Sequence, residues 1–319
     1  MKIAFWSSAK GNTGVTSNLA CVSVVSAMEY SYKSILIENH FQKNKLENVL
    51  MYNRANYHLR ENDNYQLKPI GMDYIMYKLS NVKYTNMFVN NSTKVVDYSE
   101  PIHISDNINV NKTNEKADQT RYIHSQAQLE TKKVINEASL EILGNSLYYI
   151  PNNEQTNKEA FDYNLYDNIN HILKALESFA DITYIDTSNH NSLSSKIILE
   201  EVDLVVVNLV QNSAMIEHFF RNYSSILSKC VFLIGSYHKK SDLDINKISK
   251  AHLINKSNIA AIPYNVEYQE AVLQGTVVEF FARNYSCKRK NPNYNFIHEV
   301  KKAVNMIIGN AELICRKEK

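Results

Sequence analysis

A short stretch near the N-terminus has the residue types needed to hold a phosphate group. It runs from Ile3 to Asn18 and reads IAFWSSAKGNTGVTSN, an apolar run followed by a loop of small residues that contains two glycines. An apolar, small-residue run from Leu19 to Met28 comes next, so we expect a strand, a loop and a helix in that order. Backbone N–H groups at a helix start, together with the helix dipole, suit an anion. The stretch is a candidate phosphate-binding loop, and a plain strand, tight turn and helix is the alternative.

The loop departs from the usual phosphate-loop sequence at the position of its lysine. Where such a loop reads Gly-Lys-Ser/Thr, this one reads Gly14-Val15-Thr16. Val15 lacks the ammonium group that would neutralise the β- and γ-phosphates, so we expect ATP to bind weakly, as a structural ligand. The candidate nucleotide-binding residues taken from the loop are Gly11, Asn12, Thr13, Gly14, Val15, Thr16 and Ser17.

A second chemical group lies at the end of a strand much further along the chain. Residues 182–187 read ITYIDT, a buried strand that ends with Asp186. In phosphate-loop NTPases a Ser or Thr hydroxyl and a strand-end Asp hold the Mg²⁺ that bridges the phosphates. Thr16 and Asp186 are therefore the candidate Mg²⁺ ligands. Glu38 and His40 end another expected strand, at 34–40, and are either chemical groups or solvated strand-end residues.

Composition and charge narrow the class of protein. Hydrophobic residues make up 44% and charged residues 21% of the 319 residues, which is ordinary for a globular protein. The formal charge of +2 provides no global field for nucleic-acid or membrane binding. The four cysteines lie far apart without metal-ligand spacing, which fits a reducing cytoplasm. A signal-peptide pattern and an apolar run of about 20 residues are both absent from the sequence, so we expect a cytoplasmic protein.

Alternating strands and helices follow in the second half of the chain. Strands are expected at 146–151, 182–187, 203–209, 231–235 and 259–263, and helices at 164–180, 192–201, 215–228 and 245–253. Such alternation with apolar strands predicts an α/β fold, a mostly parallel sheet flanked by helices on both faces. We expect one P-loop NTPase-like domain over residues 1–319, with an Asn-rich insertion or mobile region at about 81–126.

Two helices carry further expectations. Residues 129–143 are predicted to form one helix, ended by Gly144-Asn145 as its C-cap. The last helix, 296–315, combines an apolar stripe with basic residues at Lys301 and Lys302. It either packs on the sheet or lies on an anionic membrane surface as a basic amphipathic helix.

The loop and the strand ends together resemble the ParA/MinD family of deviant Walker ATPases. That family's loop reads Lys-Gly-Gly-x-Gly-Lys-Thr-Thr, and Lys10 to Ser17 read KGNTGVTS. The resemblance covers residues 1–50 and about 146–285. Its other matches are LIENHFQ at 36–42 for Leu-Ile-Asp-x-Asp-x-Gln, DTS at 186–188 for Asp-Thr-Pro, the acid and valine-rich strand at 203–209, and IPYN at 262–265 followed by Glu270, Ala271 and Gly275.

The resemblance implies a P-loop NTPase fold, ATP and Mg²⁺ as ligands, and a homodimer. In that family the signature lysine, here Lys10, reaches the phosphates of the partner subunit. The family's water-positioning acid corresponds to His40, which is a weak candidate for a substitute base. With Val15 in place of the other lysine, we expect nucleotide binding with little or no hydrolysis.

A narrower resemblance suggests a role. The Trp-Ser turn before the loop, and a short Gly-x-Asp-x-apolar helix before the third expected strand, look like the TadZ/CpaE branch. This implies a positioning or assembly factor for a tad-type (Flp) pilus or secretion apparatus, with a protein partner and at most peripheral membrane contact. The alternatives are an active ParA-type partitioning ATPase and a metabolic α/β enzyme. The near-neutral charge disfavours DNA binding, and the sequence contains no catalytic set for metabolism.

Overall fold

The computed structural model describes residues 1–9, 11, 13–41, 44–51, 71–78, 128–152, 157–189 and 192–317. The expected insertion at 81–126 lies outside the described residues. The strands are β1 (Lys2–Trp6), β2 (Ser34–Asn39), β3 (Leu140–Leu143), β4 (Leu147–Tyr149), β5 (Ile182–Thr187), β6 (Leu204–Leu209), β7 (Cys230–Tyr237) and β8 (Ile259–Pro263). The labelled helices are α1 (Val15–Glu29), α5 (Lys158–Glu177), α6 (Ser192–Glu201), α7 (Ser213–Asn222), α8 (Ile245–Ala251), α9 (Val266–Gln274), α10 (Val277–Asn284) and α11 (Tyr294–Lys317). Residues 45–51, 72–78 and 128–138 are also helical.

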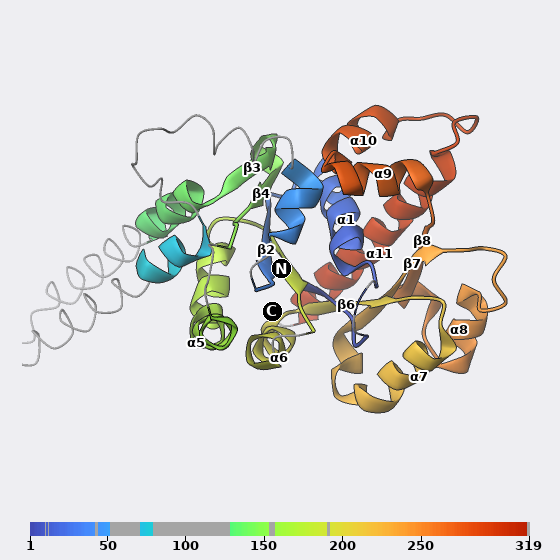
Figure 1. The fold of residues 1–319 in the computed structure, drawn as a ribbon, viewed down its shortest axis with the longest axis horizontal. Coiled ribbons are helices and arrows are strands. Elements are labelled where there is room, and N and C mark those ends of the chain that lie inside the picture. The colour runs from blue at the N-terminus through green and yellow to red at the C-terminus, as the bar shows by residue number, and fades with distance from the viewer. Residues whose placement is uncertain are drawn as a thin grey trace, which may run out of the picture.

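The strands of the described residues form one sheet, in the order β3-β4-β2-β5-β1-β6-β7-β8 (Figure 1). Neighbouring strands run parallel throughout, apart from the antiparallel pair of β3 and β4 at one edge. Each parallel crossover from β5 onwards contains a helix, as the geometry of parallel strands requires. The predicted α/β architecture is confirmed.

Helices cover both faces of the sheet and create two hydrophobic cores. Side chains alternate across a strand, so Ile3 and Phe5 of β1 enter one core while Ala4 and Trp6 enter the other. The first core contains α1, α9, α10 and α11, and the second contains α5, α6, α7 and α8. Figure 1 shows the two groups of helices on opposite sides of the strands. Burial on both faces explains why the strands of this sheet are apolar at nearly every position.

The predicted helix at 129–143 is wrong in its second half. The helix ends at residue 138, and Leu140–Leu143 forms β3, with Leu140 opposite Tyr149 of β4. Gly144, at a φ of 47°, begins the short 3₁₀ turn that joins the two strands. A short apolar run fits a helix or a strand equally well by periodicity, and here pairing with the sheet edge decides. The helices α9 and α10 follow β8, where no helix was predicted.

Helix α11 packs on the sheet with its whole apolar stripe. Val300, Val304 and Ile307 are fully buried in the first core, and Lys301 forms an ion pair of 2.9 Å with Glu29 of α1. The packed alternative is confirmed, because the face that would have entered a membrane surface is covered by protein. Among the described helices, none is both long and apolar enough to span a bilayer.

Two substitutions on α11 test this packing. Ile307→Ala should lower the free energy of unfolding by about 2–5 kcal/mol, because it removes a fully buried side chain. Leu313→Ala is the matched control, since Leu313 is 57% exposed on the same helix, and should change it by no more than about 0.5 kcal/mol. Urea denaturation measures both. Equal effects of the two substitutions would mean that α11 does not pack as described.

Candidate functional site

The loop between β1 and α1 presents backbone donors to a cavity. Gly14, at a φ of 72°, occupies the left-handed region that favours glycine and caps the start of α1. The N–H groups of the first helical turn have no partner within the helix and are available to an anion. The cavity has a volume of about 720 Å³, and the loop residues that line it are Gly11, Thr13, Gly14, Val15, Thr16 and Ser17. Two predicted binding residues, Lys10 and Asn12, lie outside the described residues.

The structure brings Thr16 and Asp186 together. The Thr16 hydroxyl donates a hydrogen bond of 2.7 Å to Oδ2 of Asp186, across 170 positions of sequence. Asp186 lies near the end of β5, which runs between β1 and β2, and it is completely buried. Both side chains offer oxygen atoms, the kind of ligand that Mg²⁺ prefers. Their role as Mg²⁺ ligands stays a prediction.

A second carboxyl group lies directly beside Asp186. Glu38 of β2 is opposite Asp186 in the parallel register, and its side chain is 1% exposed. The Tyr149 hydroxyl donates to one Glu38 oxygen, and the backbone N–H of Lys45 donates to the other at 3.0 Å. Burial, and secondly the negative charge of Asp186, raise the pKa of Glu38 well above its usual value, although these hydrogen bonds act in the opposite direction.

His40 faces the carboxylate of Asp186. Its Nε2 lies 3.1 Å from Oδ1 of Asp186, yet neither atom makes a hydrogen bond within the described residues. The side-chain amide of Asn152 donates to the backbone carbonyls of both Glu38 and His40, at 2.9 and 3.2 Å, and so fixes the end of β2. Imidazole and carboxylates thus meet at one buried point.

Comparisons with known proteins add to this geometry. Neither a family model nor a curated protein sequence matches the chain. A solved ParA family ATPase from Chlorobium tepidum TLS superposes with a TM-score of 0.56 at 12% identity, covering 95% of this chain and 96% of its own. The chain has the fold of the ParA and MinD ATPases. MinD from Pyrococcus horikoshii OT3, complexed with Mg-ADP, superposes with a TM-score of 0.56 at 13% identity, covering 98% of this chain and 99% of its own. A chain of the MinC:MinD cell division protein complex of Aquifex aeolicus superposes with a TM-score of 0.55 at 11% identity, covering 97% of this chain and 96% of its own.

A buried amide network supports the loop of this ParA/MinD fold from below. Asn18 of α1 donates a hydrogen bond of 2.9 Å from Nδ2 to Oδ1 of Asn208 on β6. Gly235 of β7 lies so close that a Cβ atom there would stand 2.5 Å from Asn18 Nδ2. This network was not predicted from the sequence. The only signal was Asn208 itself, a polar residue inside a valine-rich strand.

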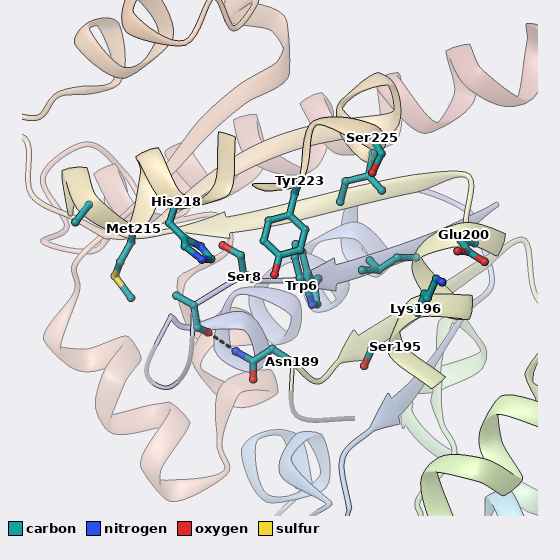
Figure 2. Close-up of a pocket in the computed structure, with 14 residues that line it drawn as sticks. Trp6, Ser8, Asn189, Ser195, Lys196, Glu200, Met215, His218, Tyr223 and Ser225 are labelled. Carbon is teal, nitrogen blue, oxygen red and sulfur yellow. Dashed lines mark hydrogen bonds between the residues drawn. The ribbon is translucent and has the colours of Figure 1, made fainter. Parts of the chain in front are cut away.

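A second cavity, of about 820 Å³, lies on the other side of the loop (Figure 2). The rings of Trp6 and Tyr223, with centroids 4.9 Å apart, form one wall. Ala9 and Asn189 line both cavities, and the Asn189 amide donates to the Ala9 carbonyl, so this hydrogen bond belongs to their shared wall. The other side chains drawn around it come mainly from α6 and α7: Ser195, Lys196, Glu200, Met215 and His218. This cavity was not predicted from the sequence, and it lacks the carboxylates of the strand ends.

Two buried tyrosines test how Glu38 is held. Tyr149→Phe should lower the free energy of unfolding by about 1–3 kcal/mol, because it leaves a buried oxygen of Glu38 without its hydrogen bond. Tyr184→Phe is the matched control. Its buried hydroxyl donates a hydrogen bond of 2.9 Å to the Ser26 hydroxyl, a neutral acceptor. We therefore expect the free energy of unfolding to fall by about 0.5–1.5 kcal/mol. Denaturation at neutral pH without metal or nucleotide measures both. A larger effect at Tyr184 would contradict the arrangement described for Glu38.

Proposed function

We propose that this chain is a ParA/MinD-like positioning or assembly factor that binds ATP weakly and hydrolyses little or none of it. The observation that carries the proposal is the hydrogen bond between Thr16 and Asp186, which holds loop and strand end in place while two other positions have changed. Val15 stands where the loop lysine is expected, and His40 stands where the water-positioning acid is expected. The geometry for holding a nucleotide is therefore retained without the groups for turning it over.

Nucleotide binding is supported by the fold and by the N–H groups of the first turn of α1, which have no partner within the helix. MinD from Pyrococcus horikoshii OT3, which shares this fold, is complexed with Mg-ADP. In this chain Thr16 and Asp186 would hold the Mg²⁺, whose charge would offset that of the phosphates. The ligand atoms that suit Mg²⁺ are oxygens, so the hydroxyl of Thr16 and the carboxylate of Asp186 fit it, whereas the nitrogen of His40 does not.

Weak binding and poor turnover follow from the two changed positions. Val15 is the first residue of α1 and lines the loop cavity with an apolar side chain. A charge-assisted hydrogen bond of the kind a lysine makes there is worth about 1.5–3 kcal/mol, or roughly 10- to 150-fold in affinity. Loss of a positioned general base typically costs about 10²–10⁴-fold in rate. His40 already faces Asp186, so it is poorly placed to replace that base.

The proposed partners are a second copy of this chain and a different protein. MinD of Aquifex aeolicus, which shares the fold, forms a complex with another protein, MinC. The formal charge of +2 gives no basis for strong non-specific binding to DNA. We therefore favour a protein partner in a tad-type pilus or secretion apparatus, with the chain in the cytoplasm and recruited by that partner to the membrane or pole.

Fluorescent ATP titrations and hydrolysis assays test the nucleotide site. Thr16→Ala should weaken ATP binding in the presence of Mg²⁺. Ser257→Ala, which removes an exposed hydroxyl from the short 3₁₀ turn before β8, is the control and should leave ATP binding unchanged. Val15→Lys should tighten binding roughly 10- to 150-fold without restoring turnover. Combining it with His40→Asp should restore some hydrolysis.

The partitioning alternative predicts the opposite result in the same assays. Wild-type protein that hydrolyses ATP with stimulation by DNA, and loses this activity with Asp186→Ala, would overturn the proposed function. Sub-micromolar DNA binding at physiological salt would also favour the partitioning alternative. A chain with this charge should bind DNA non-specifically no more tightly than a Kd of about 10⁻⁴ M, the weak end of the usual range.

Analytical ultracentrifugation tests the dimer. We expect a weak homodimer whose affinity changes when ATP is added and when Lys10 is replaced by alanine, because the family's signature lysine contacts the partner's phosphates. Lys239→Ala is a control that removes an exposed lysine elsewhere and should leave the equilibrium unchanged. Protein that stays monomeric at high concentration, with and without ATP, would contradict the dimer.

A further inference from the structure

Three buried side chains with metal-binding atoms converge at the ends of β2 and β5. They are Glu38, His40 and Asp186, and one ligand atom from each lies within 4.8 Å of the others. The side chain of His40 is 10% exposed, and those of Glu38 and Asp186 are essentially inaccessible. The cluster borders the loop cavity through His40, which is one of its lining residues.

Among the described residues, the facing atoms of His40 and Asp186 have no hydrogen-bond partner, although the two atoms are close together. Nε2 and Oδ1 are 3.1 Å apart and both are buried, but their geometry is not that of a hydrogen bond. Leaving a buried polar atom unpartnered costs about 1–3 kcal/mol, so two of them side by side call for a shared ligand. Two neighbouring ligands of a metal ion with bonds of about 2.1 Å lie about 3.0 Å apart in an octahedral site and about 3.4 Å apart in a tetrahedral site. The observed separation fits such an ion between them.

Glu38 is placed to provide a third ligand. Its two oxygens each accept one hydrogen bond, from Tyr149 and from the backbone of Lys45, and each retains a further lone pair. Among the described residues, no lysine or arginine forms an ion pair with Glu38 or Asp186. Buried carboxylates need a compensating cation or a bound metal, and a dication would meet this need for both.

We propose that Glu38, His40 and Asp186 bind a divalent first-row transition ion such as Zn²⁺ or Mn²⁺, in preference to Mg²⁺ and without nucleotide. Imidazole nitrogen is a ligand for transition ions, whereas Mg²⁺ selects carboxylate, carbonyl and water oxygens. Both carboxyl side chains and the backbone that carries His40 are held in position by other groups, as is typical of ligands in metal sites. Tyr149 orients Glu38, Thr16 orients Asp186, and Asn152 fixes the backbone on both sides of position 39.

This inference shares its location with the proposed nucleotide site and does not depend on nucleotide binding. Because all three ligands come from the chain itself, the ion should bind to protein that contains no ATP. Retained ATP binding without transition-metal binding would refute the metal site alone. Metal binding without ATP binding would refute the proposed function alone.

The experiment uses Co²⁺ as a spectroscopic probe on the full chain, purified without a polyhistidine tag and stripped of metal and nucleotide. One Co²⁺ per chain should bind and give visible ligand-field absorption. Equimolar Zn²⁺ should displace it, whereas a roughly hundred-fold excess of Mg²⁺ should not. Absence of Co²⁺ binding, or displacement by Mg²⁺ as readily as by Zn²⁺, would overturn the proposal.

Substitutions assign the site. His40→Ala should reduce the affinity for Co²⁺ and Zn²⁺ by at least about ten-fold. His298→Ala, which removes an exposed imidazole on α11, should leave it unchanged. His40→Asp keeps three ligands but makes all of them oxygens, so it should lose the preference for Zn²⁺ and gain affinity for Mg²⁺. This second variant keeps the proposal testable if His40→Ala folds poorly. Equal Co²⁺ affinity in wild type and a folded His40 variant would show that the ion binds adventitiously elsewhere, and would overturn the proposal.

Discussion

Two carboxyl groups buried side by side are the constraint on which the rest of this site depends. Glu38 and Asp186 are opposite each other in the parallel register of β2 and β5, and both are removed from water. Such a pair is unfavourable unless hydrogen bonds or a cation compensate it. Three hydrogen bonds do part of this, from the hydroxyls of Thr16 and Tyr149 and from the backbone N–H of Lys45. The imidazole of His40 lies 3.1 Å from Asp186 without forming a hydrogen bond to it.

The fold brings these groups together because β5 lies between β1 and β2. The loop after β1 and the end of β2 therefore reach the same point from either side of Asp186, in the crevice where open α/β sheets bind ligands. The two cores keep the strands in register. A slip of β5 by one residue would turn Asp186 towards α5 and α6, and would bring Ile185 to face the loop. Packing far from the site thus decides which side chain is presented there.

Much of this arrangement could be predicted from the sequence, since it follows from local patterns and one topological rule. The glycine loop with Thr16, the apolar strands, and Glu38 and Asp186 near the ends of their strands are all visible in the chain. The hydrogen bond from Tyr149 to Glu38 was not predictable, because it depends on how β4 aligns with β2. The edge strand β3 was missed for the same kind of reason: its four residues become a strand only by pairing with β4.

The close approach of Asn18 to Gly235 restricts how this protein can change over generations. A side chain at position 235 would require the Asn18 side chain to move, because a Cβ atom there would stand 2.5 Å from Asn18 Nδ2. A smaller residue at position 18 would make room for a side chain at position 235, but it would remove the hydrogen bond to Oδ1 of Asn208. Asn18, Asn208 and Gly235 are therefore coupled, and we expect substitutions at these three positions to occur together in related sequences.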